Sequence, residues 1–359
     1  MTSAPASTYA VLPADLAGDR DLLREIVNRN TSSALAEVSQ ARLDWLFDQN
    51  PAGSTLGWFL RTEPDGHTVG TGSLVPRVMG VGGASVLCAR ASLLAVDSTH
   101  RALGPAAMIA RRGVVGAQEH GFPTVLGVAP PATIPIFTRC GYVRLGDYVR
   151  YAKPLSLAPQ FTRLTGVARG ARAASALPDL LLRLGSRDSW LSAGDSVVRT
   201  LTEFDSRFDD LWARAGASYG FTTARTSAFL TWRFTACPDP RAFVVHGLLS
   251  PDLAELRGYA VSSTDGPHAF LYDLFAEAGG DAMSRVLATA IRWARSQRAQ
   301  TLSIWVGASP RVVETLTRFG FRPRHDGPKT TAVLVAGYDA GVVKQITESG
   351  WYVLAADNV

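Results

Sequence analysis

The stretch SLLAVDSTHRALGPA, residues 92–106, decides the fold class of this chain. Its first five residues have the character of a strand, and the residues after it place apolar side chains at helical spacing. The element between them reads R-x-x-G-x-A, with Arg101, Gly104 and Ala106 at its defined positions. Backbone N–H groups at such a helix start form a concave donor set for a pyrophosphate. Arg101 adds a cation, Gly104 lets phosphates approach the backbone, and Ala106 keeps the next turn tight.

This stretch belongs to an internal repeat of roughly 150 residues. The pattern L-x-W-x-F-x-x-x-P occurs at residues 43–51 and again at residues 230–238 with the same internal spacing. Each copy continues with three strands, a helix, a strand and a helix. The first copy closes on Gly141-Tyr142 and the second on Gly320-Phe321. Two motifs that recur in the same order predict two domains of the same α/β type.

A connector separates the two copies. We predict an N-terminal domain over residues 1–153, a linker over 154–201 and a C-terminal domain over 202–359. The linker contains four glycines and several arginines, and residues 180–184 are its best helix candidate. One interpretation is a basic amphipathic segment that touches an anionic membrane surface. The other is a linker helix that packs on both domains.

The composition sets limits on the function. Of the 359 residues, 47% are hydrophobic and 19% are charged, which suits two globular cores. No apolar run approaches the ~20 residues needed to span a bilayer. The first ten residues do not resemble a signal peptide, so a cytoplasmic protein is expected. The three cysteines are far apart, which argues against zinc and disulfides, and the net charge of +5 is only mildly basic.

The order strand, V-x-x-x-H-R-x-x-G-x-A, helix, apolar strand, helix and G-Y resembles motif A and its sequel in the GNAT N-acetyltransferases. The resemblance implies two tandem GNAT-like domains, each a twisted mixed sheet flanked by helices, in which the central parallel strands splay apart. It also implies acetyl-CoA or another acyl-CoA as co-substrate, and no metal. Pantetheine would lie along Leu94, Ala95 and Val96. The pyrophosphate would be bound by Arg101, Ala102, Leu103, Gly104 and Ala106.

The residues expected to perform catalysis depart from the family pattern. The usual tyrosine is replaced by Phe137, and a common asparagine by Pro130. The acid could instead be Tyr142 or Tyr148. Asp97 is the candidate general base, although a turn or N-cap residue ahead of the phosphate loop is the simpler interpretation of this position.

The second copy lacks R-x-x-G-x-A, because residues 278–283 read AGGDAM. We therefore expect the acyl-CoA site in the first copy. In the second copy Asp273 and Glu277 would suit a cationic acceptor, and Arg225 and Arg233 an anionic one. Ion pairs between such residues are the competing interpretation.

Three functions are compatible with the sequence. The first is an acyl-CoA-dependent N-acyltransferase acting on an amine of a small metabolite, amino sugar or natural-product intermediate. The second is a Fem-like transferase that uses aminoacyl-tRNA, against which the phosphate loop argues. The third is a non-catalytic acyl-CoA-binding or scaffold protein, which the replaced tyrosine favours. Under the first hypothesis no nucleic acid partner is expected, and the oligomeric state stays open, a homodimer included.

Overall fold

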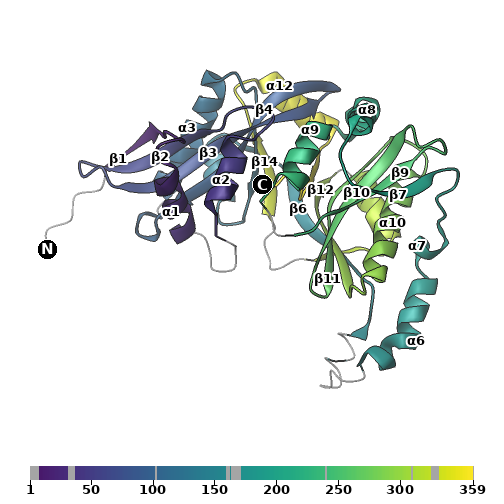
Figure 1. Cartoon of the computed structure of the whole chain (residues 1–359). Coiled ribbons are helices and arrows are strands. Elements are labelled where there is room, and N and C mark those ends of the chain that lie inside the picture. The colour runs from purple at the N-terminus through teal and green to yellow at the C-terminus, as the bar shows by residue number, and fades with distance from the viewer. Residues whose placement is uncertain are drawn as a thin grey trace. The chain divides into compact units, whose positions relative to one another are not determined.

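The computed structural model describes residues 8–30, 37–101, 103–158, 162, 171–238, 241–308, 310–324 and 331–358 (Figure 1). The chain divides into two compact units. Unit 1 comprises Met1–Asp147, Thr235–Pro238 and Thr331–Ser349, and unit 2 comprises Tyr148–Phe234, Asp239–Thr330 and Gly350–Val359. The predicted boundaries follow chain order, whereas these units take segments from both halves of the chain.

Unit 1 is a mixed sheet with helices packed on it. Its strands run in the order β1-β2-β3-β4-β5-β14, and among the described residues only β4 and β5 of these strands pair in parallel. The strands are β1 (Thr8–Pro13), β2 (Leu56–Glu63), β3 (Thr68–Val81), β4 (Ala84–Val96), β5 (Val125–Ala129) and β14 (Thr331–Ala336). The helices are α1 (Arg20–Asn30), α2 (Gln40–Phe47), α3 (Leu103–Glu119), α4 (Ile134–Arg139) and α12 (Ala340–Ser349). Helices α1 and α3 both pack against β3 and β4.

Unit 2 repeats this arrangement. Its strands run in the order β6-β12-β11-β10-β9-β7, and in the described ranges β11 and β12 are the pair of these strands that runs in parallel. The main strands are β6 (Val143–Pro154), β7 (Val197–Leu201), β9 (Val244–Leu249), β10 (Leu256–Asp265), β11 (His268–Ala276) and β12 (Thr301–Ala308). The short strands are β8 (Thr222–Thr223), β13 (Arg322–Arg324) and β15 (Tyr352–Leu354). The helices are α6 (Ala171–Leu184), α7 (Arg187–Trp190), α8 (Ser206–Ala215), α9 (Ser227–Leu230), α10 (Ala282–Ser296) and α11 (Pro310–Arg318), with a π-helix at Thr231–Thr235.

The tryptophan motifs form the short helices that the sequence predicts. In the first copy Trp45 of α2 is buried, and the hydroxyl of Ser39 accepts a hydrogen bond from Arg42 N to cap the helix. In the second copy the motif falls on α9 and the π-helix, where Trp232 and Phe234 are buried. These apolar side chains fix the helices to the units by burial.

Two strands are exchanged between the halves of the chain. From Tyr148 onward β6 lies in unit 2, where Tyr151 pairs with Ile304 of β12. In return β14 lies in unit 1, where Ala332 pairs with Ala129 of β5. Each sheet is therefore completed by a strand from the other repeat.

Part of the segment predicted as a linker forms regular secondary structure of unit 2. Its last strand, β7, pairs with β9 at the edge of the unit 2 sheet. The predicted helix at residues 180–184 is the end of α6. Among the described residues, no helix is long and apolar enough to cross a membrane.

Candidate functional site

The two parallel strands of unit 1 separate soon after they meet. Strands β4 and β5 pair only at Ala89 with Val125 and at Arg90 with Leu126. Beyond this point β4 continues to Val96 and β5 to Ala129 with no further pairing between the described residues. The edge of β4 that faces this gap carries backbone groups that an extended ligand can pair with.

A bulge redirects β4 inside the gap. Leu93 has a φ of 51°, a conformation that is costly for a residue with a branched side chain. The register with β3 shifts at the same place, because Thr71 pairs with Ala95 but Ser73 pairs with Ser92. Bulges of this kind re-aim the chain next to functional sites.

The open edge borders a cavity of about 430 Å³. Its walls come from the end of α1, the end of β4, the loop after it, the start of α3 and the region before α4. They include five of the eight residues predicted to bind CoA: Leu94, Ala95, Val96, Arg101 and Ala106. The predicted strand edge and phosphate loop therefore meet at one cavity.

The helix start contributes the remaining predicted residues. Leu103 and Gly104 begin α3, where backbone N–H groups have no acceptor within the helix. A Cβ built on Gly104 would meet no atom within 4 Å, and the φ of Gly104 lies outside the left-handed range. Neither packing nor backbone conformation thus requires this glycine, whereas close approach of a ligand does. Ala102 lies outside the described residues.

Arg101 closes the cavity by tying two elements together. Its Nε donates to the carbonyl of Val96 at 3.0 Å, and its Nη2 donates to Oδ1 of Asn30 at 3.1 Å. The remaining nitrogen, Nη1, has no hydrogen-bond acceptor among the described residues. One part of the guanidinium is therefore structural, and the other part remains for an anion.

Asp97 is held by α1. Its Oδ2 lies 2.6 Å from Nη2 of Arg29, and its Oδ1 accepts from Nδ2 of Asn30 at 2.6 Å. Burial acts to raise the pKa of Asp97, but the hydrogen bonds from Arg29 and Asn30 outweigh it and the pKa is lowered. A carboxylate engaged in this way is a weak base. The role of general base stays a prediction, and the contacts favour a positioning role.

Tyr142 lies beside a second, smaller cavity of about 20 Å³. Its ring packs edge-on against Phe137 with 4.8 Å between centroids, and both side chains are buried. Leu94 lines this cavity as well as the larger one, so the two cavities share a wall. Burial raises the pKa of Tyr142 well above its usual value, so its hydroxyl stays protonated and can donate a hydrogen bond.

The three cysteines carry no catalytic environment. Cys88 and Cys237 are buried, and in the described part of the chain the three cysteines form no disulfide. Burial raises the pKa of the Cys88 thiol to about 12, which keeps it from forming a thiolate. In the described part of the chain, no three His, Cys, Asp or Glu side chains gather as metal ligands.

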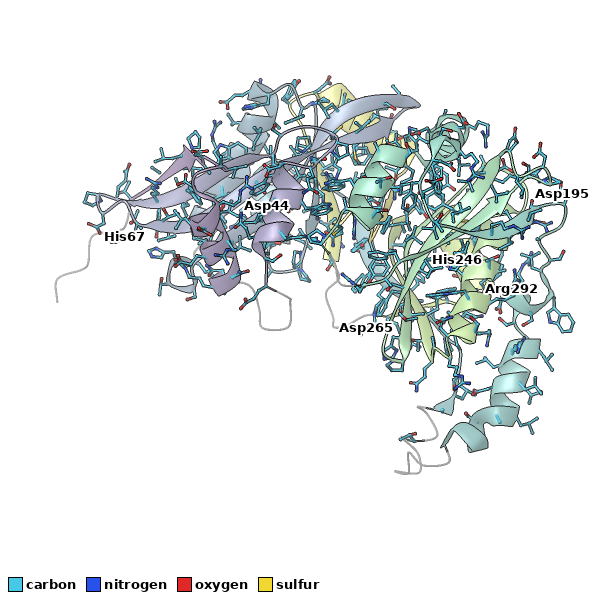
Figure 2. The ribbon with its side chains drawn as sticks, viewed as in Figure 1. Asp44, His67, Asp195, His246, Asp265 and Arg292 are labelled. Carbon is cyan, nitrogen blue, oxygen red and sulfur yellow. The ribbon has the colours of Figure 1, made fainter. Side chains whose placement is uncertain are left out.

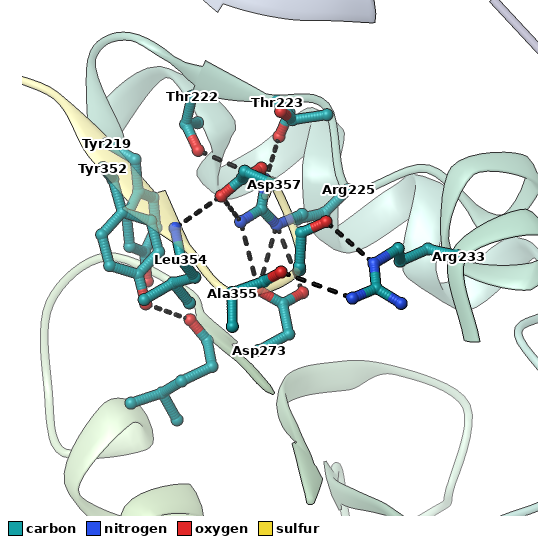
Figure 3. A network of polar contacts seen from close by, with 12 residues as sticks. Tyr219, Thr222, Thr223, Arg225, Arg233, Asp273, Tyr352, Leu354, Ala355 and Asp357 are labelled. Atoms are coloured by element: carbon teal, nitrogen blue, oxygen red, sulfur yellow. Dashed lines mark hydrogen bonds and ion pairs between the residues drawn. The ribbon is translucent and has the colours of Figure 1, made fainter. Parts of the chain in front are cut away.

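The corresponding gap of unit 2 is filled by the chain itself (Figure 3). Strands β11 and β12 pair from His268 with Thr301 up to Leu271 with Ile304, and beyond this pair they separate. Strand β15 pairs with β12 at Val306–Ala308, on the side opposite β6. We call residues 350–358 the closing segment.

Alternate backbone carbonyls along the end of β11 accept hydrogen bonds from other parts of unit 2. Ala356 N donates to the carbonyl of Tyr272 at 2.9 Å, and the hydroxyl of Tyr352 donates to the carbonyl of Leu274. The hydroxyl of Tyr219 donates to the carbonyl of Ala276 at 2.7 Å. The strand edge that is open in unit 1 is therefore paired in unit 2.

A buried ion cluster holds the closing segment. Arg225 is fully buried and contacts Asp357 at 2.7 Å and Asp273 at 3.1 Å (Figure 3). Asp357 Oδ2 also accepts from Leu354 N, and Tyr259 donates its hydroxyl to Asp273 at 2.7 Å. Desolvation opposes the charge of Arg225, but the two carboxylates outweigh it and raise the pKa of Arg225. Sequence reasoning singled out Arg225 and Asp273, but the partner Asp357 carried no local signal.

Comparisons with known proteins identify the fold. No protein-family model matches the sequence, and no curated protein matches it significantly. Among solved structures, a protein of Enterococcus faecalis described as a probable N-acyltransferase superimposes with a TM-score of 0.65 at 11% identity, covering 93% of this chain and 74% of that chain. A GCN5-related N-acetyltransferase from Kribbella flavida gives 0.59 at 14% identity, covering 95% and 74%.

N-myristoyltransferase from Saccharomyces cerevisiae, solved with bound myristoyl-CoA, is also similar. It gives a TM-score of 0.57 at 14% identity, covering 93% of this chain and 84% of that chain. The GNAT fold predicted from the sequence is therefore confirmed over nearly the whole chain.

Proposed function

We propose that this chain is an acyl-CoA-dependent N-acyltransferase whose donor site is the gap between β4 and β5 in unit 1. One observation carries the proposal: an unpaired, bulged strand edge and a helix start with an unobstructed glycine border the same cavity. Such an edge pairs with an amide-containing chain, and such a helix start binds phosphates. The structural neighbours described as N-acyltransferases support this reading.

The donor-binding residues have distinct tasks in this proposal. Leu94, Ala95 and Val96 present backbone groups to the pantetheine arm. The pyrophosphate lies at the first turn of α3, where Ala102, Leu103, Gly104 and Ala106 supply the cradle. Arg101 contributes its Nη1 as a cation. Pro105 supplies no N–H, so the loop has one donor fewer than its length suggests.

The acyl group is short. The apolar cavity beside Leu94 measures about 20 Å³, and Trp58, Phe137 and Ile109 limit it. That space is comparable to one water molecule and suits a methyl group. Acetyl-CoA is therefore the proposed donor, unlike the myristoyl-CoA bound by the yeast neighbour.

The reaction follows from these positions. Bound acyl-CoA supplies a thioester carbonyl that a neutral amine can attack. The amine nitrogen forms the new C–N bond, the C–S bond breaks, and the nitrogen loses the proton that the sulfur gains. Tyr142 donates a hydrogen bond to the leaving sulfur, because a tyrosine hydroxyl is protonated at neutral pH. Asp97, paired with Arg29, holds Asn30 at the wall of the cavity.

The acceptor in this proposal is an amine of a small molecule. The donor site itself is built from residues of unit 1 alone. A cytoplasmic location belongs to the same proposal. The closed gap of unit 2 leaves one donor site per chain.

Calorimetric titration with acetyl-CoA tests the proposal. Wild-type protein is expected to bind one equivalent, and Gly104→Trp is expected to abolish binding by filling the phosphate cradle. Val115→Trp is the matched control, because Val115 is exposed on the same helix and lies outside the cavity. An acceptor screen that follows thiol release then tests turnover.

The outcomes separate the three functions. Binding with turnover supports the acyltransferase. Binding without turnover on any amine favours the non-catalytic acyl-CoA-binding protein. No binding by wild-type protein refutes the proposal and favours the transferase that uses aminoacyl-tRNA.

A further inference from the structure

The helix α6 of unit 2 turns an apolar face to solvent. Leu177, Leu181 and Leu184 follow each other at intervals of four and three residues, so they share one face. Leu177 and Leu181 are 66% and 62% exposed, and Trp190 of the neighbouring α7 is 72% exposed. Large apolar side chains gathered in this way usually mark an interaction surface.

This face is outward because the opposite side of the segment is anchored. Asp179 of α6 accepts hydrogen bonds from the Ser156 hydroxyl at 2.8 Å and from Leu157 N at 2.6 Å. In α7 Asp188 is fully buried, 3.4 Å from Nζ of Lys153 and 3.3 Å from Nε of Arg295. These contacts fix the segment to β6 and α10.

Arg292 of α10 completes the anchor. Arg292, which Figure 2 labels, donates from its Nη1 to the carbonyl of Asp188 at 2.8 Å and to the carbonyl of Leu191 at 3.0 Å. The leucines therefore belong to a surface held in place.

A basic cavity of about 430 Å³ lies under the same helix. Arg183 of α6 lines it together with Arg295 and Arg298 at the end of α10. Nη2 of Arg295 is buried and has no hydrogen-bond partner within the described ranges. The side chains of Arg183 and Arg298 likewise have no acceptor there.

The acids of the segment compensate only part of the charge of these arginines. Between residues 171 and 190 the acids are Asp179 and Asp188. Asp179 already accepts from Ser156, Leu157 and Ser175, and Asp188 is paired with Lys153 and Arg295. Asp179 itself lines the cavity, so three arginines face one carboxylate there and the cavity carries a net positive charge beside an apolar face.

We propose that α6 and α7 dock this protein on the surface of a phospholipid bilayer with anionic head groups. The leucines and Trp190 enter the boundary between head groups and acyl chains, where tryptophan is preferred. A head-group phosphate enters the cavity and accepts hydrogen bonds from Arg183, Arg295 and Arg298. This docking is independent of the acyl-CoA site proposed in unit 1.

Vesicle flotation with the full chain tests the proposal. Wild-type protein is expected to bind vesicles of phosphatidylcholine with 30% phosphatidylglycerol and to stay free with phosphatidylcholine alone. Binding to the anionic vesicles is expected to fall when salt is raised. Arg183→Glu/Arg298→Glu and Leu177→Ser/Leu181→Ser are each expected to weaken binding about tenfold or more, since each removes two of the groups that contact the membrane.

Matched variants control for charge and exposure. Arg199→Glu/Arg318→Glu makes the same change of charge at exposed positions outside the cavity. Leu12→Ser/Leu87→Ser removes two exposed leucines from unit 1. Both controls are expected to bind anionic vesicles as the wild type does. Circular dichroism and melting temperature verify that every variant is folded.

Three results would overturn the proposal. The first is wild-type protein that does not bind the anionic vesicles. The second is a leucine variant that converts a dimer to a monomer in light scattering while vesicle binding is unchanged, which assigns the face to a second copy of this chain. The third is inorganic phosphate binding that Arg183→Glu/Arg298→Glu abolishes without any vesicle binding, which assigns the cavity to a free anion.

Discussion

Removing the charge of Asp357 should destabilise unit 2 and loosen its closing segment. In Asp357→Asn the side chain keeps its size but loses a carboxylate that accepts from Arg225 Nη1 at 2.7 Å, Arg225 Nη2 at 2.8 Å and Leu354 N at 2.6 Å. Arg225 stays fully buried with Asp273 as its single carboxylate partner. Breaking a buried ion pair costs about 3–5 kcal/mol, and the remaining partner places this change near 3 kcal/mol.

Urea unfolding measures this loss, and hydrogen exchange locates it. Amides of the closing segment and of Tyr272–Ala276 should exchange faster in the variant, because the strand edge of β11 loses its cover. Asp195→Asn is the matched control, since Asp195 pairs with Arg257 at 3.1 Å but is 73% exposed. That change should leave the free energy of unfolding nearly unchanged, because solvent screens an exposed ion pair. An Asp357→Asn protein that loses under about 1 kcal/mol, or no more than the control, would refute the reasoning.

Three further predictions concern acid stability and the acyl-CoA site. Burial lowers the pKa of His246 to about 4, so as the pH falls this histidine takes up a proton in the unfolded chain before it does so in the folded protein. The free energy of unfolding should therefore fall by about 2 kcal/mol from pH 7.5 to pH 5. Melting curves should show this loss in wild type and in His67→Phe, whose side chain is exposed, but not in His246→Phe. Phe137→Val should enlarge the small cavity and raise the rate with butyryl-CoA relative to acetyl-CoA; an unchanged ratio would contradict the acyl position. Arg101→Ala should weaken CoA binding about tenfold by calorimetry, whereas Arg144→Ala, an exposed arginine paired with a neighbouring aspartate, should leave it unchanged.

Much of the donor site could be predicted from local sequence. The strand, the R-x-x-G-x-A loop and the helix are consecutive, so their chain order nearly fixes their geometry. The structure accordingly brings Leu94, Ala95, Val96, Arg101 and Ala106 to one cavity. The bulge at Leu93 was not predicted, because a leucine gives no signal for a positive φ.

The candidate catalytic residues were harder to predict. Asp97 follows the strand as the sequence suggests, yet its partners Arg29 and Asn30 come from α1, 68 and 67 residues away. Those partners decide how basic the carboxylate is. Tyr142 was a candidate by position alone, and its burial against Phe137 beside the small cavity is seen only in the structure.

The sequence by itself determined the repeat and the candidate phosphate loop, since each is written in short motifs whose spacing expresses helix and strand geometry. The GNAT fold was implied by the resemblance of these motifs to that family. Only the tertiary structure decided which sheet β6 and β14 join, because an apolar strand can pair with more than one edge of similar pattern. The tertiary structure also decided that the closing segment fills the gap between β11 and β12 of unit 2. Arg225 meets Asp273 and Asp357 across 48 and 132 residues, and such contacts exist only after long-range packing has removed water from all three.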